Sequence, residues 1–302
     1  MLGLAVPQLG VLADPRLSIE VAKAAEEMGY DSLWVGDRLL NPTRPTTPYP
    51  GGDGTIPPQH RRCLDPLTVL TAVATATSRV RLGTSTLNAF WTPPVVLARS
   101  LTTIGLLSEG RLDVGLGIGW SADEYAATGI PWRGRGERLE ETLDILDLVW
   151  GESDVIRHEG RLWTIPESVI GSKPVQRPAV LLGGFSPAAL ERIGRRGDGW
   201  LAAALPLPML TRAWRGIQRH AESIGRDPAK LRLIVRVNPR ITPEPVPDEQ
   251  VPSRGTPEQI AGYLTEAVTT LDAEPLIDLH YSTENPADYL AVAGDFRKLI
   301  HT

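Results

Sequence analysis

The segment from Ser108 to Trp120, S-E-G-R-L-D-V-G-L-G-I-G-W, limits what this chain can fold into more than any other segment. Between Arg111 and Ile118, apolar residues alternate with polar residues or glycine, which is the period of a β-strand. Glycines at 115, 117 and 119 remove side chains along the end of that strand. Either a neighbouring strand or the flat face of a ligand must therefore come close to its backbone.

The composition is that of an ordinary soluble protein. The 302 residues are 42% apolar and 22% charged, which suffices for a large core. The net charge of −5 arises without a long run of either sign, so no nucleic-acid partner is expected. No apolar run approaches the roughly 20 residues of a membrane span. The first five residues lack the basic segment of a signal peptide, which favours a cytoplasmic protein.

Cysteine and histidine usage adds two expectations. Cys63 is the single cysteine, so it cannot form an internal disulfide, and it has no evident catalytic partner. The five histidines lack the spacing of metal ligands, and no metal site is expected.

Strand and helix patterns alternate along the whole chain. The first helix is expected to be capped by Ser18 and to stop at Gly29. The count is eight strands, each followed by a helix, and no change of composition marks a domain boundary. This predicts an α/β fold, a single (β/α)8 TIM barrel over residues 1–302, with an open doubly wound sheet as the alternative. The expected strands are 2–7, 32–36, 80–84, 111–118, 179–182, 200–203, 231–237 and 275–280.

In such a barrel the active site lies at the C-terminal ends of the strands. Two long proline-rich loops, at about 41–62 and 239–253, follow strands on this face and are expected to be lids, with a disordered insertion as the alternative for the first. G-G-F-S-P at 183–187 joins a strand to a helix. It is either an anion site at the helix N-terminus or an ordinary turn with Ser186 as the N-cap.

Together and in this order, the motifs resemble the bacterial luciferase-like monooxygenase superfamily, and more closely its branch that uses the deazaflavin coenzyme F420. The resemblance runs from Leu2 to Trp200, about two thirds of the chain. It rests on L-W-V-G-D at 33–37, L-D-P at 64–66, V-R-L-G-T at 80–84, T-P-P-V-V-L-A-R at 92–99, L-S-E-G-R-L-D-V-G-L-G-I-G-W at 107–120, E-Y at 124–125, R-L-E-E at 138–141, L-G-G-F-S at 182–186 and G-D-G-W at 197–200.

The resemblance implies coenzyme contacts at particular positions. Asp37 matches the family aspartate that contacts the coenzyme. Ser85 and Thr86 stand where the family has a non-prolyl cis peptide behind the deazaflavin ring, and Asn88 follows as a ring or ribityl contact. The remaining positions are Ile118, Gly119 and Asp123, which match residues lining the ring and its tail, and Gly183, Gly184 and Ser186, which match the loop that holds the coenzyme phosphate.

Two positions depart from the family pattern, and they are the candidate catalytic residues. Arg38 stands where many members have a histidine that acts as an acid or hydrogen-bond donor at the ring. Trp120 stands where the sugar-phosphate dehydrogenases of this branch have a glutamate base, which argues against that activity here. Arg38 is expected to stabilise an anionic substrate or the reduced coenzyme, or else to form a salt bridge or face outward. Trp34, Phe90, Trp91 and Trp120 are expected to form apolar pocket walls.

The leading hypothesis is an oxidoreductase that passes a hydride between C5 of F420 and a small-molecule substrate, with the coenzyme carrying the chemistry. An FMN-dependent monooxygenase that uses reduced flavin and oxygen is the first alternative. A relative that binds a ligand without catalysis is the second. The resemblance also implies a homodimer.

Overall fold

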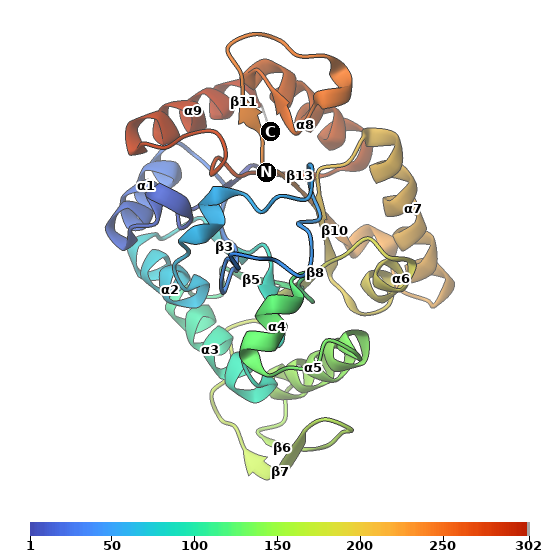
Figure 1. Cartoon of the computed structure of the whole chain (residues 1–302). Helices are drawn as coiled ribbons and strands as arrows, with labels where there is room; N and C mark the ends of the chain where they lie inside the picture. The colour runs from blue at the N-terminus through green and yellow to red at the C-terminus, as the bar shows by residue number, and fades with distance from the viewer. Residues whose placement is uncertain (301–302) are drawn as a thin grey trace.

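Eight parallel strands close into a barrel in the computed structural model, which describes residues 1–300 (Figure 1). The strands follow one another around the ring in the order β3–β2–β1–β13–β10–β9–β8–β5, and pairing of β3 with β5 closes it. This confirms the predicted (β/α)8 barrel. The barrel strands are β1 (Gly3–Ala5), β2 (Ser32–Val35), β3 (Arg81–Thr84), β5 (Leu112–Gly117), β8 (Ala179–Gly183), β9 (Gly199–Ala203), β10 (Arg232–Val237) and β13 (Glu274–Ile277).

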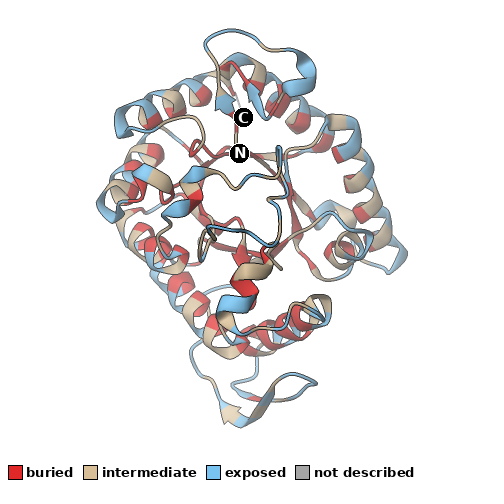
Figure 2. Cartoon of the chain, in the orientation of Figure 1, coloured by how far each residue is buried: buried red, intermediate tan, exposed pale blue. Residues whose placement is uncertain are grey.

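Helices surround the barrel, and their buried faces point inward towards the buried strands (Figure 2). Both α4 and α5 follow β5. No helix within residues 1–300 is long and apolar enough to cross a membrane. The helices are α1 (Pro15–Glu27), α2 (Pro66–Ala76), α3 (Pro94–Leu107), α4 (Ala122–Thr128), α5 (Arg135–Trp150), α6 (Pro187–Arg196), α7 (Leu207–Ser223), α8 (Pro257–Leu271) and α9 (Pro286–Leu299). Shorter elements are the 3-10 helices η1 (Gly10–Leu12), η2 (Pro58–Arg61), η3 (Pro228–Lys230) and η4 (Asp248–Gln250), the hairpin β6 (Val155–Glu159) with β7 (Thr164–Val169), and β4 (Leu87–Asn88), β11 (Arg240–Ile241) and β12 (Arg254–Gly255).

The start of α1 corrects one prediction. The N-cap is Asp14, not Ser18, because the Asp14 carboxylate accepts hydrogen bonds from the backbone N–H groups of Arg16 (2.8 Å) and Leu17 (3.0 Å). Proline at the first helical position favours this earlier start. Ser18 lies one turn inside the helix, where its hydroxyl donates to the Pro7 carbonyl at 2.7 Å.

The barrel interior is filled with side chains in layers. At the N-terminal end, the fully buried Asp113 carboxylate pairs with Arg81 and, at 3.0 Å, with Arg232. The middle layer is an apolar cluster of Trp34, Leu181, Leu201, Ile234 and Leu276. The barrel is therefore a packed core, and only its C-terminal end is open to a ligand.

Trp34 fills the centre of this core. The indole N–H donates to the Ser32 hydroxyl at 2.8 Å. A Cβ atom on Gly83 would overlap the indole ring, and one on Gly3 would lie 2.8 Å from its nitrogen. The expectation that Trp34 forms a wall of the ligand pocket is therefore wrong, because the barrel interior takes up the side chain.

Gly115 and Gly117 of β5, and Gly119 just beyond its end, accommodate the chain segment at the end of β3 and after it. A Cβ on Gly115 would overlap the Thr84 carbonyl oxygen, one on Gly117 would lie 2.7 Å from Thr86 Oγ1, and one on Gly119 would overlap the Asn88 amide. Of the two possibilities open at the sequence level, a neighbouring protein segment is thus the one observed. Every second residue of the segment 84–88 thus faces one of these glycines.

The two proline-rich loops have different positions. The first, at 41–62, crosses the mouth of the barrel (Figure 1), and its Tyr49 and His60 line the cleft there. The second, at 239–253, lies at the edge of the barrel beside α8, where Val246 exchanges two hydrogen bonds with the Gln259 side chain (3.0 and 2.7 Å). Its expected role as a lid is corrected accordingly: none of its residues lines the cleft.

The packing around Trp34 predicts a large difference between two glycine substitutions. Gly83→Ala forces a methyl group into the indole ring, so we expect the free energy of unfolding to fall by about 3 kcal/mol. Gly216→Ala, in α7 with no atom within 4 Å of the new methyl group, is the control and is expected to stabilise by about 0.5–1 kcal/mol. Urea denaturation of both variants measures the difference, and similar values for the two would contradict the described packing.

Candidate functional site

A cleft of about 250 Å³ opens at the C-terminal end of the barrel. It contains seven of the residues expected from the sequence: Asp37, Arg38, Ser85, Thr86, Asn88, Gly119 and Trp120. Of the other expected wall residues, Trp91 lines the cleft, whereas Phe90 packs in the core. Gly36, Ala203, Asn238 and Tyr281 also line the cleft, as expected for residues that end or directly follow the predicted strands 32–36, 200–203, 231–237 and 275–280. The lining residues that sequence analysis missed are Leu9, Tyr49, His60, Glu124 and Arg236.

Asp37 stands at the end of β2 and holds the segment after β3. Its carboxylate accepts a hydrogen bond from the Asn88 backbone N–H at 2.9 Å. Burial raises the pKa of Asp37 to about 6, and the nearby charge of Glu124 adds to this effect. Its protonation state therefore changes close to neutral pH.

Arg38 and Glu124 form a buried ion pair on the wall of the cleft. Arg38 Nη2 lies 2.9 Å from Glu124 Oε1, and the two side chains are 9% and 4% exposed. The guanidinium also lies 4.6 Å from the centre of the Trp120 ring, within the range of a cation–π contact. Of the possibilities left open for Arg38, the structure shows the salt bridge. Its positive charge is already neutralised.

Aromatic side chains from the 41–62 loop and from the loop after β13 also line the cleft. The His60 Nε2 atom lies 3.0 Å from the Tyr281 hydroxyl, which lies 3.3 Å from the Tyr49 hydroxyl. Tyr49 also makes an edge contact with Trp120, at 5.3 Å between ring centres. Burial and the positive charges of Arg38 and Arg236 lower the pKa of His60 to about 3, so the imidazole is neutral.

The Ser85–Thr86 peptide bond is cis, as the resemblance implies. Arg236, from β10, donates from Nη1 to the Ser85 carbonyl oxygen and from Nη2 to Asp278. A guanidinium inside the barrel thus holds the segment that carries the cis bond. Arg236 in turn depends on the carboxylate of Asp278.

Asp278 belongs to a buried chain of polar groups. Its Oδ1 accepts from His280 Nδ1, and His280 Nε2 accepts from the Gln8 backbone N–H at 3.0 Å, which assigns the proton to Nδ1. Burial raises the pKa of the Asp278 carboxyl, but the hydrogen bonds from His280 and the charge of Arg236 outweigh burial and hold that pKa well below its usual range. The Gln8 amide also exchanges hydrogen bonds with the Gly36 backbone (2.7 and 2.9 Å).

Unpaired donors are concentrated in this cleft. Within residues 1–300, five buried side-chain nitrogen or oxygen atoms lack a hydrogen-bond partner, and four of them belong to cleft residues. They are Arg38 Nε, His60 Nδ1, Asn88 Nδ2 and Arg236 Nε. Arginine and amide nitrogens can only donate. Since buried donors are almost always paired, the cleft is suited to a ligand rich in hydrogen-bond acceptors.

Five expected coenzyme positions lie outside the lining of the cleft. The Ile118 carbonyl accepts from the Tyr125 hydroxyl. The Asp123 carboxylate accepts from the Thr46 backbone N–H at 3.0 Å and so anchors the 41–62 loop. Gly183, Gly184 and Ser186 connect β8 to α6, where the Ser186 hydroxyl accepts from the Ala189 N–H at 3.3 Å as the N-cap.

The missed residues had only weak sequence signals. Asp278 follows the apolar run P-L-I directly and His280 comes two residues later, and a polar residue at the end of a buried strand is the one cue for them. Arg236 interrupts the apolar strand L-I-V-R-V, and a charged residue inside such a strand is a second cue. Arg236 meets Ser85 across 151 positions and His280 meets Gln8 across 272, and no local pattern indicates these contacts.

Comparison with protein families identifies one match. The family model described as luciferase-like monooxygenase matches residues 5–246.

A curated relative is the F420-dependent glucose-6-phosphate dehydrogenase of Amycolatopsis mediterranei, 32% identical over 194 residues. The match covers 63% of this chain and 54% of that protein, so it spans about half of the relative's length.

Solved structures share the fold over nearly the whole chain. A monooxygenase from Streptomyces bottropensis superposes with a TM-score of 0.80 at 18% identity, covering 99% of this chain and 98% of the other. An F420-dependent secondary alcohol dehydrogenase, solved with an F420–acetone adduct, gives a TM-score of 0.80 at 15% identity, with coverages of 100% and 99%.

The buried ion pair predicts that Glu124→Gln is strongly destabilising. Glutamine keeps an acceptor for the Leu39 N–H, now 2.9 Å from Glu124, but leaves the Arg38 charge unpaired. We expect the free energy of unfolding to fall by about 3 kcal/mol. The control is Glu137→Gln, which breaks the ion pair with Arg161 (side chains 65% and 77% exposed) and should change stability by less than about 0.5 kcal/mol. Equal losses in urea denaturation would contradict a buried pair.

The raised pKa of Asp37 predicts a pH-dependent gain in the variant Asp37→Asn. The folded protein retains the Asp37 proton up to about pH 6, whereas the unfolded chain releases it near 3.8, so this carboxyl makes the wild type less stable as pH rises through that window. Asparagine does not titrate. The stability of the variant relative to wild type should therefore increase by about 1 kcal/mol between about pH 5 and pH 8.

Urea denaturation at both pH values measures this gain. Asp295→Asn, which removes an exposed carboxylate on α9, is the control and should show no comparable change. A relative stability of Asp37→Asn that stays constant or falls with pH would overturn the assignment.

Proposed function

Because the chain belongs to the luciferase-like monooxygenase family and is thus an oxidoreductase, we propose that it uses coenzyme F420 and passes a hydride between the deazaflavin C5 and a small organic substrate. The activity named for the Amycolatopsis mediterranei relative supports F420 as the coenzyme. The F420-dependent secondary alcohol dehydrogenase of the same fold is consistent with this choice.

One observation carries the proposal: the unpaired donors of the cleft. Arg38 Nε, Asn88 Nδ2 and Arg236 Nε are buried N–H groups without acceptors. The pyrimidine edge of a deazaflavin presents carbonyl oxygens and ring nitrogens, which are the acceptors that such donors require. The residues present therefore fit the coenzyme ring.

The proposed coenzyme contacts follow from the positions of the residues. Asp37 and Asn88 would bind the ring edge, with Ser85 and Thr86 behind the ring. Gly119, with Ile118 and Asp123 beside it, would border the ring and its tail. Gly183, Gly184 and Ser186 would hold the phosphate, since Gly183 adjoins Thr86 and leads to the N-terminus of α6. When bound, the coenzyme supplies the hydride donor or acceptor, and the protein supplies position and exclusion of water.

We propose that the substrate is not a sugar phosphate. The charge of Arg38 is neutralised by Glu124, and Trp120 covers the guanidinium, so this arginine does not offer a free cation to a phosphate group. Tyr49, Tyr281 and Trp91 give the cleft hydroxyls and an aromatic wall. These features suit a small uncharged molecule that carries an oxygen function.

An FMN-dependent monooxygenase is the second candidate. The same unpaired donors fit the flavin ring edge, and the monooxygenase of Streptomyces bottropensis has an equally high TM-score of 0.80.

Homodimerisation and the single-domain organisation stay predictions.

Titration of the purified protein with F420, and in parallel with FMN, tests the proposal. We expect micromolar or tighter binding of F420 and binding of FMN at least about tenfold weaker. Asn88→Ala removes an unpaired donor and should weaken F420 binding by about tenfold. The control Asn41→Ala, outside the cleft, should leave it unchanged.

Two outcomes would overturn the assignment. A preference for FMN would replace F420-dependent hydride transfer by flavin-dependent oxygenation. Binding of neither coenzyme would remove the enzymatic proposal altogether.

A further inference from the structure

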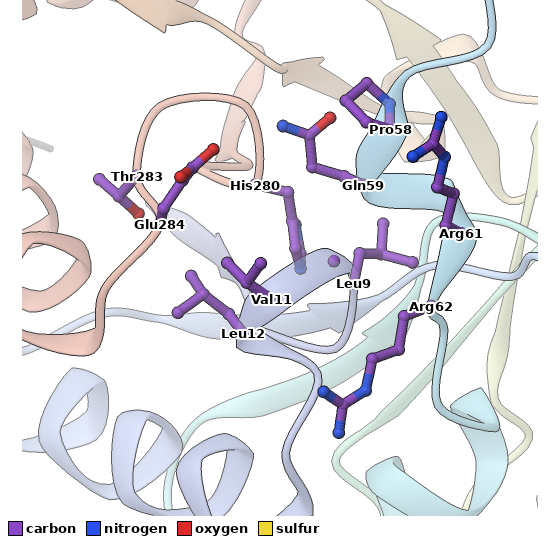
Figure 3. Close-up of a pocket in the computed structure, with 11 residues that line it drawn as sticks. Leu9, Val11, Leu12, Pro58, Gln59, Arg61, Arg62, His280, Thr283 and Glu284 are labelled. Atoms are coloured by element: carbon purple, nitrogen blue, oxygen red, sulfur yellow. The ribbon is translucent and has the colours of Figure 1, made fainter.

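Among the residues of η2, His60 lines the cleft. Its neighbours Pro58, Gln59 and Arg61 line a separate cavity of about 330 Å³ (Figure 3). The 3-10 helix η2 therefore lies between two cavities and presents an imidazole to the cleft. His60 is buried there, with 7% of the residue exposed.

Contacts with the segment before α1 hold this imidazole in place. The Gly10 N–H donates to the Arg62 carbonyl at 2.9 Å, and Leu9 forms an isolated β-bridge with Cys63. Both contacts are made directly after η2. The protein itself thus sets the position of His60, which is what a residue that binds substrate requires.

The Nε2 atom of His60 belongs to a chain of hydrogen bonds that reaches solvent. It lies 3.0 Å from the Tyr281 hydroxyl, which lies 3.3 Å from the hydroxyl of the half-buried Tyr49. Burial raises the pKa of Tyr281 well above its usual value, so this hydroxyl keeps its proton. A neutral imidazole nitrogen is a more basic acceptor than a phenol oxygen, and its distance to Tyr281 is the shorter one. Tyr281 therefore donates to His60 Nε2, and Tyr49 donates to Tyr281.

The proton of the His60 ring is consequently on Nδ1. Burial and the positive charges of Arg38 and Arg236 lower the pKa of His60 to about 3, against a smaller opposite effect of Asp278, so the ring is neutral. In a neutral imidazole, a nitrogen that accepts a hydrogen bond leaves the proton to the other nitrogen. Within residues 1–300 the Nδ1 atom has no hydrogen-bond partner. It is a buried donor that requires an acceptor.

The acceptor that remains for this donor is the substrate. The other three unpaired donors of the cleft are assigned to the coenzyme ring by the proposed function. The ring of His280, which Figure 3 shows between the loops, already has both nitrogens bonded, to Asp278 and Gln8. The charge of Arg38 is paired with Glu124. This leaves the Nδ1–H group of His60 for a substrate oxygen.

We propose that His60 binds the oxygen atom of the substrate through Nδ1–H, and that Tyr281 and Tyr49 link this imidazole to solvent as a proton relay. The inference rests on the proposed function, which supplies the hydride. A neutral donor stabilises the negative charge that develops on a carbonyl oxygen during hydride transfer. It brings no charge to pair with a carboxylate or a phosphate. The substrate class is therefore an uncharged ketone or aldehyde, or the corresponding alcohol.

The transfers balance in the direction of reduction. The carbonyl carbon accepts a hydride from the reduced, anionic coenzyme, so a C–H bond forms, the carbonyl π bond breaks, and two electrons pass to the substrate. The oxygen takes the proton of His60 Nδ1. His60 Nε2 takes the proton of Tyr281, Tyr281 takes that of Tyr49, and Tyr49 takes one from solvent. Exchange with solvent after the product leaves restores the starting tautomer, and oxidation of an alcohol runs the same transfers in reverse.

NMR of the coenzyme-free protein tests the tautomer without any turnover. We expect the 15N-labelled His60 ring to be neutral between about pH 5 and pH 8 and to carry its proton on Nδ1, since its pKa is about 3. The variant His60→Asn identifies its signals. A charged ring, or a proton on Nε2, would overturn the proposal.

Reduction of acetone, cyclohexanone and acetophenone by reduced F420 tests the reaction. We expect the wild type to reduce at least one of these ketones. His60→Ala should lower kcat/KM for that ketone by about 100-fold, because the oxygen loses its donor, while the Kd of F420 stays within about twofold of wild type. Tyr281→Phe keeps the ring but breaks the relay, and should lower kcat about tenfold with little change in KM. The control His220→Ala, on α7, should change neither constant.

Chemical rescue separates proton transfer from a structural role. Imidazole added to His60→Ala should raise kcat/KM by about tenfold, whereas 1-methylimidazole, which has no N–H group, should not. Thermal unfolding of the variants checks the fold. Tyr281→Phe tests the relay if His60→Ala does not fold.

The results that would overturn this inference differ from those that would overturn the proposed function. The inference alone falls if the wild type binds F420 but reduces none of the three ketones, or if His60→Ala or Tyr281→Phe is as active as wild type. It also falls if His60→Ala binds F420 more weakly, or if both imidazoles or neither restore activity. A wild type that does not bind F420 would instead remove the proposed function, and with it the reaction.

Discussion

The close packing of the 84–88 segment on β5 is the constraint on which the site depends. Thr84, Thr86 and Asn88 occupy the space that side chains at Gly115, Gly117 and Gly119 would take. Thr84 Oγ1 completes the contact by accepting from the Gly115 N–H (2.9 Å) and donating to the Gly115 carbonyl (2.8 Å). Glycine is therefore needed at positions 115, 117 and 119 because another chain segment lies against them. Ser85, Thr86 and Asn88 of this segment form one wall of the cleft, and the missing side chains leave the space that the segment occupies.

Buried charge is distributed unevenly along the barrel axis. At the N-terminal end, Asp113 is compensated by Arg81 and Arg232, so that layer is closed and structural. At the C-terminal end, Asp278 neutralises Arg236, but the Arg236 Nε remains without an acceptor. The middle layer around Trp34 keeps the two sets of charges apart. The charges at the N-terminal end of the barrel are thus all paired, whereas the C-terminal end has a buried N–H donor that still requires an acceptor.

The sequence predicted the barrel because each of its units is local. Helix caps, proline positions and apolar runs place eight strands with an error of a few residues, and the errors have physical causes. The last strand was expected to reach His280 but ends at Ile277, because Asp278 and His280 leave the sheet to bond with each other and with Arg236 and Gln8. The cleft residues next to recognisable motifs, such as Asp37 and Asn88, were also predicted. Glu124 and Arg236 were not, because their roles arise from partners 85 and 151 residues away in the chain.

The pairing of the first strand with the last has a consequence for how the protein is made. β1 pairs with β13, the Tyr289 hydroxyl donates to the Ala5 carbonyl (2.6 Å), and Gln8 meets His280 across 272 positions. A ribosome-bound chain cannot form these contacts until nearly all of it has emerged. Contacts between such distant parts of a chain also form slowly. The polar chain that fixes the cleft is therefore among the last features to assemble, and a fragment shortened at either strand would lack it.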